Sequence, residues 1–299
     1  MFNNINRLKE KKMFKDLEHS EFLPNGFLIL LVFAILWGGS FGLGRLISTY
    51  LLKDVTNQTL GLSLRSIITC GFQIFIFFLW VRFIEKRKFS TVGFRGNSRL
   101  YKFIIGFFIG IISITIITFI LFLAGAIQIE IVQNINMSIS SYIGIIVIVA
   151  GWLVQSASEE IGIRGWLIPL LGAKYNPLIS ILVTSITFGV LHLFVPAATI
   201  LSFANLILSG IFFALYAISE DSLLGVWGCH FGWNLALGNI YAFSVSGFSP
   251  RGSAIFKIKV IGDPLLTGGQ FGPEGGLLAT LIVIIGIIIC SIRIKKNLA

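Results

Sequence analysis

Two adjacent carboxylates and an arginine interrupt a long apolar stretch of the sequence. Glu159, Glu160 and Arg164 follow the apolar run 142–154, and further apolar residues come after them. An ionisable side chain inside a membrane-spanning segment is costly, so it normally faces the bundle interior or a water-filled cavity and marks a functional site. On a helix, Glu160 and Arg164 share a face, whereas Glu159 points about 100° away. We therefore expect Glu160 and Arg164 to pair and Glu159 to stay free.

Two later apolar segments each supply a pair of side chains at helical spacing. The sequence FGVLH places Phe188 and His192 four residues apart, and HFGWN does the same for His230 and Asn234. At about 1.5 Å of rise per residue, Glu159 and His192 each stand roughly 20 Å from the apex of the hairpin that joins their helices. His230 stands roughly 12 Å from its own turn. We expect these side chains to converge in one cavity that opens toward the cytoplasm.

This combination of side chains suits peptide hydrolysis in a membrane. The reaction needs a base that activates water and hydrogen-bond donors for the oxyanion that develops at the carbonyl. Glu159 would be the base with His192 sharing the water, and His230 and Asn234 would serve the oxyanion. A metal version is equally consistent with the sequence, because Glu159, His192 and His230 form a ligand set for a divalent metal such as zinc. The sequence does not choose between the two versions.

The composition indicates an integral membrane protein. The 299 residues are 56% hydrophobic and only 12% charged, more apolar than the core of one soluble domain could bury. A hydrocarbon core of roughly 30 Å needs about 20 apolar residues per helix. Hydropathy predicts such stretches at 26–52, 60–84, 101–127, 141–171, 177–194, 199–219, 223–245 and 277–294. The expected fold class is all-α, with about eight transmembrane helices.

The net charge is +10, and the positions of the basic residues along the chain indicate membrane topology rather than a nucleic-acid-binding surface. Lys and Arg are concentrated before residue 16, between residues 82 and 102, and after residue 292, whereas the connection 128–140 has neither. The positive-inside rule then places both termini in the cytoplasm, as an even number of spans requires.

The three polar motifs resemble those of a known family. EEIGIR, FGVLH and HFGWN look like the EExxxR, FxxxH and HxxxN motifs of the CPBP family of intramembrane endopeptidases, which is related to the eukaryotic type II CAAX prenyl proteases and to bacterial Abi and lysostaphin-resistance-type proteins. The resemblance covers about 141–245, and GPEGG before the last span also looks family-like. It implies that the catalytic residues are Glu159, His192, His230 and Asn234, accompanied by the pair Glu160 and Arg164.

The resemblance implies an eight-helix bundle that cleaves peptides near the membrane. Bacterial members of the family are associated with processing of peptide pheromones or bacteriocin leaders and with self-immunity to bacteriocins, whereas prenylated CAAX substrates belong to the eukaryotic branch. We expect a multi-pass protease of a bacterial plasma membrane, with membrane lipids and a peptide or protein substrate as partners and no nucleic acid. Two other classes stay open: a proton- or ion-coupled transporter, and a non-catalytic immunity protein that binds its target in the membrane.

These expectations divide the chain into three regions. A basic amphipathic arm (1–25) lies on the anionic inner leaflet, and three N-terminal transmembrane helices occupy 26–140. The catalytic core (141–299) includes a Gly/Pro-rich outer loop (246–276) and the last span. Within that loop the alternating sequence IFKIKVI predicts a short strand.

Overall fold

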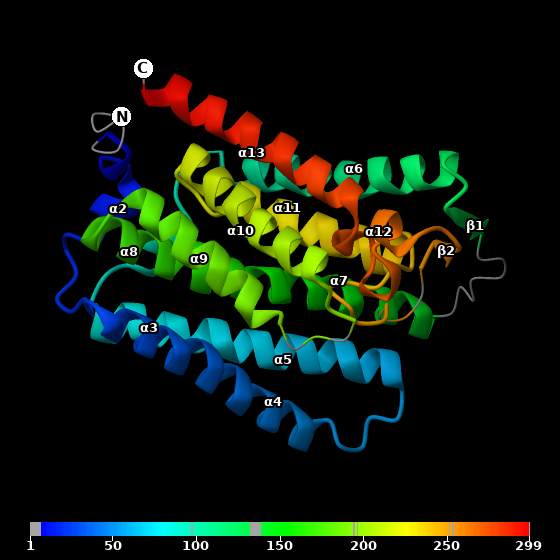
Figure 1. Ribbon diagram of the computed structural model, residues 1–299. Coiled ribbons are helices and arrows are strands. Elements are labelled where there is room, and N and C mark those ends of the chain that lie inside the picture. Colours follow the sequence, from blue (N-terminus) through cyan, green and yellow to red (C-terminus); the bar gives the residue numbers. More distant parts are fainter. Residues whose placement is uncertain are drawn as a thin grey trace.

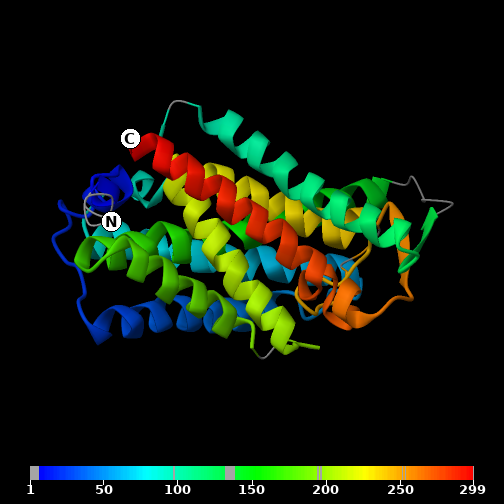
Figure 2. The same ribbon diagram turned by 45° about the horizontal axis from the view of Figure 1, so that its top comes forward.

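The protein folds into a bundle of long helices that run roughly along one direction (Figure 1). The computed structural model describes residues 7–96, 98–131, 139–193, 195, 197–250, 252 and 254–298. Six helices among these residues are long and apolar enough to cross a membrane, which supports a multi-pass membrane protein. Helix α2 (Lys12–Lys15) and the end of the last helix, α13 (Leu277–Leu298), lie at the same end of the bundle (Figures 1 and 2).

Several of the long helices contain a π-helical segment. The first span comprises α3 (Phe27–Ala34), a π segment (Ile35–Gly39) and α4 (Ser40–Leu51), and the second comprises α5 (Gln58–Leu79) and a π segment (Trp80–Ile84). A 3-10 turn (Phe89–Val92) precedes α6 (Arg99–Leu123). The fourth span joins α7 (Ile139–Glu160), a π segment (Ile161–Leu167) and α8 (Ile168–Lys174).

The remaining helices complete the bundle around α7. They are α9 (Pro177–Leu191), α10 (Ile200–Glu220), α11 (Leu224–Leu235) with its π continuation (Ala236–Ile240), and α13. The loop before α13 contains α12 (Pro264–Thr267) and two 3-10 turns (Gly269–Phe271 and Pro273–Gly275). Large apolar side chains are exposed along the helices, including Phe27, Ile146, Ile200 and Ile289, as expected where a helix faces lipid.

Two of the eight predicted spans form shorter helices. Helix α9 has 15 residues and ends at Leu191, because His192 leaves the helical conformation with ψ near 8°. Helix α11 and its π continuation end at Ile240, and Ala242 takes a positive φ of 54°. Hydropathy measures composition and does not detect where the backbone leaves a helix. Eight membrane crossings and cytoplasmic termini therefore stay predictions.

The predicted strand in the outer loop is present as β2 (Phe256–Val260). It pairs antiparallel with β1 (Ile127–Ile131), which follows α6, in a register that sets Ile129 opposite Ile258. The alternation of apolar and polar residues predicted the strand, but its partner was not predicted.

The amphipathic N-terminal arm packs onto the protein. Its apolar side chains Met13, Phe14 and Leu17 are buried, and the Phe14 ring lies so close to Gly172 that a Cβ there would be 2.2 Å from the ring. The backbone N–H of Met13 donates a 2.9 Å hydrogen bond to Asp221, beyond the end of α10. The apolar face of the arm therefore contacts the helix bundle, and the position of the arm on the inner leaflet stays a prediction.

Helices α6 and α11 approach each other through glycines. A Cβ at Gly228 would lie 2.1 Å from the carbonyl oxygen of Phe103, and one at Gly232 would lie 2.2 Å from that of Phe107. Small residues allow such close backbone contact between membrane helices. Because α11 carries His230 and Asn234, this contact fixes the position of both side chains.

Replacing Gly228 by alanine is expected to push α11 away from α6. Overpacking of this kind costs about 1–3 kcal/mol, so the melting temperature in detergent should fall, and a displaced His230 should also reduce any activity. The matched control is Gly144→Ala in α7, where an added Cβ meets nothing within 4 Å. Equal melting temperatures for the two variants would contradict the packing argument.

Candidate active site

A cavity of about 1140 Å³ lies inside the bundle and receives side chains from α4, α5, α7, α9, α10 and α11. All four predicted catalytic residues line it: Glu159, His192, His230 and Asn234. Its lining extends to 55–58 and 245–249, at the end of the bundle opposite α2 (Figure 1). The opening of the cavity toward the cytoplasm stays a prediction.

His230 lies between the two adjacent carboxylates. Its Nδ1 is 2.8 Å from Oε1 of Glu160, a hydrogen bond, and its Nε2 is 3.9 Å from Oε2 of Glu159. The latter distance is too long for a direct hydrogen bond. The ring stacks on Phe213, with centroids 5.2 Å apart. The contact with Glu160 holds the imidazole so that Nε2 faces Glu159.

The predicted pair of Glu160 and Arg164 is present and buried. Nη1 of Arg164 donates to Oε1 of Glu160 at 3.0 Å, and both side chains are almost completely inaccessible. The guanidinium also lies over the rings of Phe188, 4.5 Å from the centroid, and Phe213, 5.3 Å from the centroid. Glu160 therefore connects Arg164 to His230, and it does so where the π segment Ile161–Leu167 begins. Such π segments are frequent at functional sites.

Gln155 joins the site as a residue that the catalytic motifs do not include. Its Nε2 donates to Oε1 of Glu159, and its Oε1 accepts a 3.0 Å hydrogen bond from Nδ2 of Asn234. The signal that identifies it is its spacing, because Gln155 lies four residues before Glu159 and so shares its face of α7. Gln155 orients one carboxylate oxygen of Glu159 and leaves Oε2 available.

His192 lies at the end of α9 and turns one ring nitrogen toward its own helix. Nδ1 donates to the carbonyl oxygen of Phe188 at 2.8 Å, as the four-residue spacing of FGVLH permits, and the two rings are 4.8 Å apart. In a neutral imidazole this bond leaves Nε2 as an acceptor. Within the described part of the chain, no hydrogen bond or ion pair joins His192 directly to Glu159; the two side chains share the cavity.

The proposed metal ligands do not form a ligand cluster. Among the described residues, no three His, Cys, Asp or Glu side chains lie close enough together to hold a metal ion. Each histidine uses Nδ1 for a carboxylate or carbonyl oxygen and keeps Nε2 free, as a metal-ligating histidine also would. Only the separation of the three side chains argues against a preformed site. Glu159, His192 and His230 therefore do not fit a preformed three-ligand site, and no step of the mechanism is assigned to a metal.

Gln155 is expected to act as a positioning residue for Glu159. Hydrogen bonds to charged groups contribute about 1.5–3 kcal/mol, so Gln155→Ala should lower kcat for peptide cleavage by about 10- to 100-fold with little change in KM. Gln128→Ala, an exposed position in β1, is the matched control. A kcat equal to that of the control would mean that Glu159 needs no such orientation.

A comparison with protein families tests the resemblance of the three motifs. The family model of type II CAAX prenyl endopeptidase Rce1-like proteins matches residues 139–236. The predicted family resemblance is confirmed. This Rce1-like segment runs from the start of α7 to the residue after α11, and it contains all six predicted site residues. No curated protein and no solved structure matches the chain. The match indicates a CAAX-type peptidase of the membrane.

Proposed function

We propose that the protein is an intramembrane endopeptidase in which Glu159 activates the attacking water. The observation that carries this proposal is the state of the Glu159 carboxylate: Gln155 holds Oε1, while Oε2 faces the cavity near Nε2 of His230 without a direct hydrogen bond. A carboxylate fixed through one oxygen can take a proton through the other. Glu160 bonds Arg164 and His230 through Oε1, and its Oε2 is buried outside the cavity lining, so Glu160 is the less suitable base.

The neighbouring groups fit the remaining steps of hydrolysis. Water attacks the substrate carbonyl carbon, and its proton passes to Glu159 while Nε2 of His192 accepts the second hydrogen bond of the water. Asn234 uses one N–H for Gln155 and has a second for the oxyanion. Nε2 of His230 donates to the same oxyanion when both ring nitrogens carry protons. Glu159 then gives its proton to the leaving amine as the C–N bond breaks.

The proposed substrates are peptides or proteins that reach the cavity at the membrane. Leader or pheromone processing, CAAX-like cleavage and bacteriocin self-immunity in a bacterial plasma membrane are the roles that the motif resemblance supports. The cavity volume of about 1140 Å³ leaves room for a segment of a peptide beside Glu159.

The test is cleavage of membrane-proximal peptides by purified protein in lipid nanodiscs, followed by mass spectrometry. We expect defined fragments from the wild type and none from His192→Ala or His230→Ala. His19→Ala supplies the matched control, since His19 is exposed outside the bundle. A chelator should leave the rate unchanged, because the three candidate ligands are not clustered. Cleavage that persists in both cavity variants would contradict the proposal, whereas ion flux without fragments would favour the transporter.

A further inference from the structure

Gln73 of α5 is a buried polar side chain in the lining of the catalytic cavity, with an exposed fraction of 1%. It lies outside the Rce1-like segment. Its Nε2 donates a 3.1 Å hydrogen bond to the backbone carbonyl oxygen of Trp37, within the π segment of the first span. Because a carbonyl oxygen only accepts, this bond fixes which end of the amide is the donor. Oε1 of Gln73 is therefore left for another partner.

Oε1 of Gln73 lacks a donor within the part of the chain that the structure describes. The bond to Trp37 is the hydrogen bond that the side chain forms there, and Oε1 is not one of the fully enclosed polar atoms without a partner. The oxygen is therefore accessible from the cavity. A buried amide oxygen without a donor is costly, so such groups nearly always have one. The donor for this oxygen is a molecule in the cavity, either water or a bound ligand.

Gln73 and Glu159 lie at the same level of the bundle. Helices α5 and α7 run side by side in the same direction (Figure 1), and a Cβ at Gly162 would lie 3.2 Å from the ring of Phe77. Gln73 is one turn before Phe77 on α5. Glu159 is nearly one turn before Gly162 on α7. The ring of Trp37, whose carbonyl oxygen holds Gln73, also packs against Gly162. Both side chains line the same cavity, so one bound peptide can reach both.

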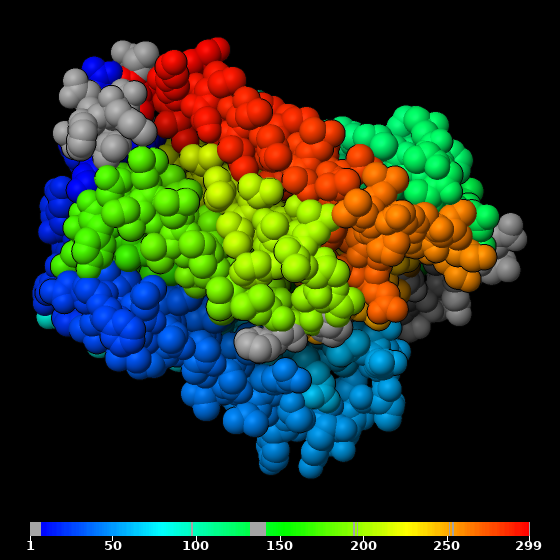
Figure 3. Space-filling model, viewed as in Figure 1, coloured from blue at the N-terminus to red at the C-terminus, as the bar shows by residue number. Residues whose placement is uncertain are grey.

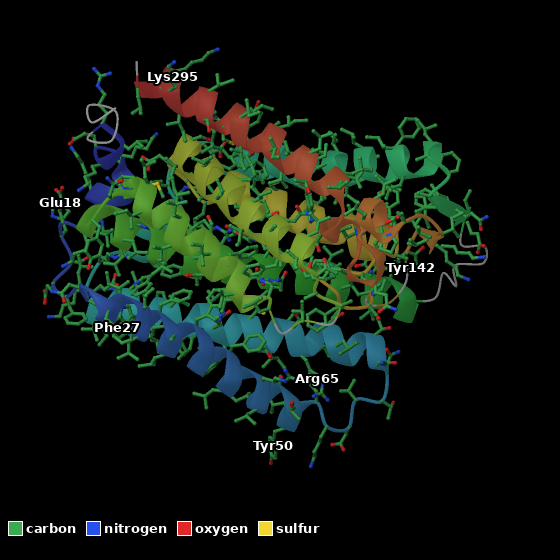
Figure 4. All side chains as sticks on the ribbon, viewed as in Figure 1. Glu18, Phe27, Tyr50, Arg65, Tyr142 and Lys295 are labelled. Atoms are coloured by element: carbon green, nitrogen blue, oxygen red, sulfur yellow. The ribbon has the colours of Figure 1, made fainter. Side chains whose placement is uncertain are left out.

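The helices that carry and support Gln73 are bonded to each other. Ser48 of α4 and Thr69 of α5 share a 3.2 Å hydrogen bond. Nη1 of Arg65 on α5 donates to Thr49 on α4 at 3.1 Å (Figure 4). Part of this helix pair projects from the rest of the bundle (Figure 3), and these bonds connect the two helices there. Gln73 therefore presents Oε1 from a fixed position on a helix rather than from a loop.

A peptide in the cavity needs acceptors for its backbone N–H groups. Each non-proline residue carries one such donor, and an unpaired donor is costly away from water. In the proposed hydrolysis, His230 and Asn234 donate to the oxyanion, so they serve the carbonyl group of the peptide. Glu159 and His192 hold the attacking water. Gln73 adds a neutral acceptor, which can bond a backbone N–H whatever the side chain of that residue.

We propose that Oε1 of Gln73 accepts a hydrogen bond from a backbone N–H of a substrate residue that flanks the cleaved bond, and that this contact holds the peptide in register for attack by water. This inference rests on the proposed endopeptidase function. Because every residue except proline offers the same N–H, Gln73 selects an extended backbone and disfavours proline at that position, without selecting a side chain.

Peptide binding tests this contact independently of cleavage. The protein carries Glu159→Gln, so that bound peptide stays intact, and it is held in zwitterionic nanodiscs. The probes are two fluorescent octapeptides with alternating alanine and leucine side chains, measured by anisotropy. One has ordinary amides, and the other has ester oxygens in place of its backbone N–H groups. With Gln73 present we expect the amide form to bind about tenfold or more tightly, because the ester has no hydrogen to donate.

Substitutions assign this preference to Gln73. Gln73→Leu keeps the approximate size of the side chain and removes the acceptor, so the ratio of the two dissociation constants should fall about tenfold through weaker binding of the amide form. Gln73→Asn keeps an amide for Trp37 but withdraws the oxygen by one methylene, and it should also lower the ratio. Gln58→Leu, at an exposed position of the same cavity lining, is the matched control and should keep the ratio. A change that only disturbs packing would weaken both probes alike and leave the ratio unchanged.

Three results would overturn the inference: no measurable binding of the amide octapeptide, a ratio that persists in both Gln73 variants, or a ratio that falls equally in Gln58→Leu. A persistent ratio would leave water as the partner of Oε1. A ratio that depends on Gln73, combined with no cleavage by the protein that retains Glu159, would refute the proposed function alone. Cleavage without such a ratio would refute only the contact of Gln73.

Discussion

Peptide cleavage by the Glu159→Gln variant is expected to fall by about 10²- to 10⁴-fold in kcat, the usual contribution of a general base. Glutamine matches glutamate in size and can still meet Gln155 and the cavity, but its amide cannot accept the proton of the attacking water. KM and the melting temperature should change little, because Glu159 forms no ion pair with Arg164 and is partly accessible from the cavity. Single-turnover cleavage measured by mass spectrometry checks the rate.

The matched control for this variant is Glu130→Gln. Glu130 is an exposed glutamate of β1, outside the cavity lining, and its nearest cation is Lys257 on β2 at 3.8 Å. It should keep the wild-type rate. If Glu159→Gln retained more than a tenth of the wild-type kcat while Glu160→Gln did not, the base would be Glu160, and the assignment of the free carboxylate would be wrong.

Breaking the buried ion pair of Glu160 and Arg164 is expected to cause a large loss of stability. Replacing Arg164 by methionine leaves Glu160 as a charge inside the bundle, with only His230 as a polar partner. Breaking a buried ion pair by removing one partner costs about 3–5 kcal/mol. The Arg164→Met protein should therefore melt well below the wild type in the same detergent, as followed by intrinsic tryptophan fluorescence.

A double-mutant cycle separates the contribution of the ion pair to stability from the contribution of the packing of Arg164. Arg164 also covers the rings of Phe188 and Phe213, and methionine retains part of that contact. We expect Glu160→Gln combined with Arg164→Met to be less destabilised than the sum of the two single changes, because no unpaired charge remains. Additive effects would mean that the ion pair contributes nothing beyond the packing of each side chain.

The helical period explains why much of the site could be predicted from the sequence. Residues four apart lie on one face, so the sequence alone indicated that Glu160 meets Arg164 and that Phe188 meets His192; both contacts are present. The same period placed Glu159 on a different face of the helix from Glu160. High hydropathy identified the membrane helices, because a helix that crosses the hydrocarbon core needs a long run of apolar side chains.

Other features depend on contacts between helices, which have no fixed spacing along the chain. The hydrogen bond of His230 to Glu160 joins residues 70 positions apart, and the bond of Asn234 to Gln155 joins residues 79 apart. No local pattern specifies such contacts. For the same reason the sequence did not indicate that side chains of α4 and α5 line the catalytic cavity.

The sequence by itself determined that this is a helical membrane protein, which residues could do chemistry, and which family the motifs resemble. Only the tertiary structure decided how those residues are used. It directs Glu160 to Arg164 and His230, holds Glu159 through Gln155, and ends α9 at Leu191, just before His192. The physical reason is that composition and helical period act within one segment, whereas the site is made where several helices pack against one another.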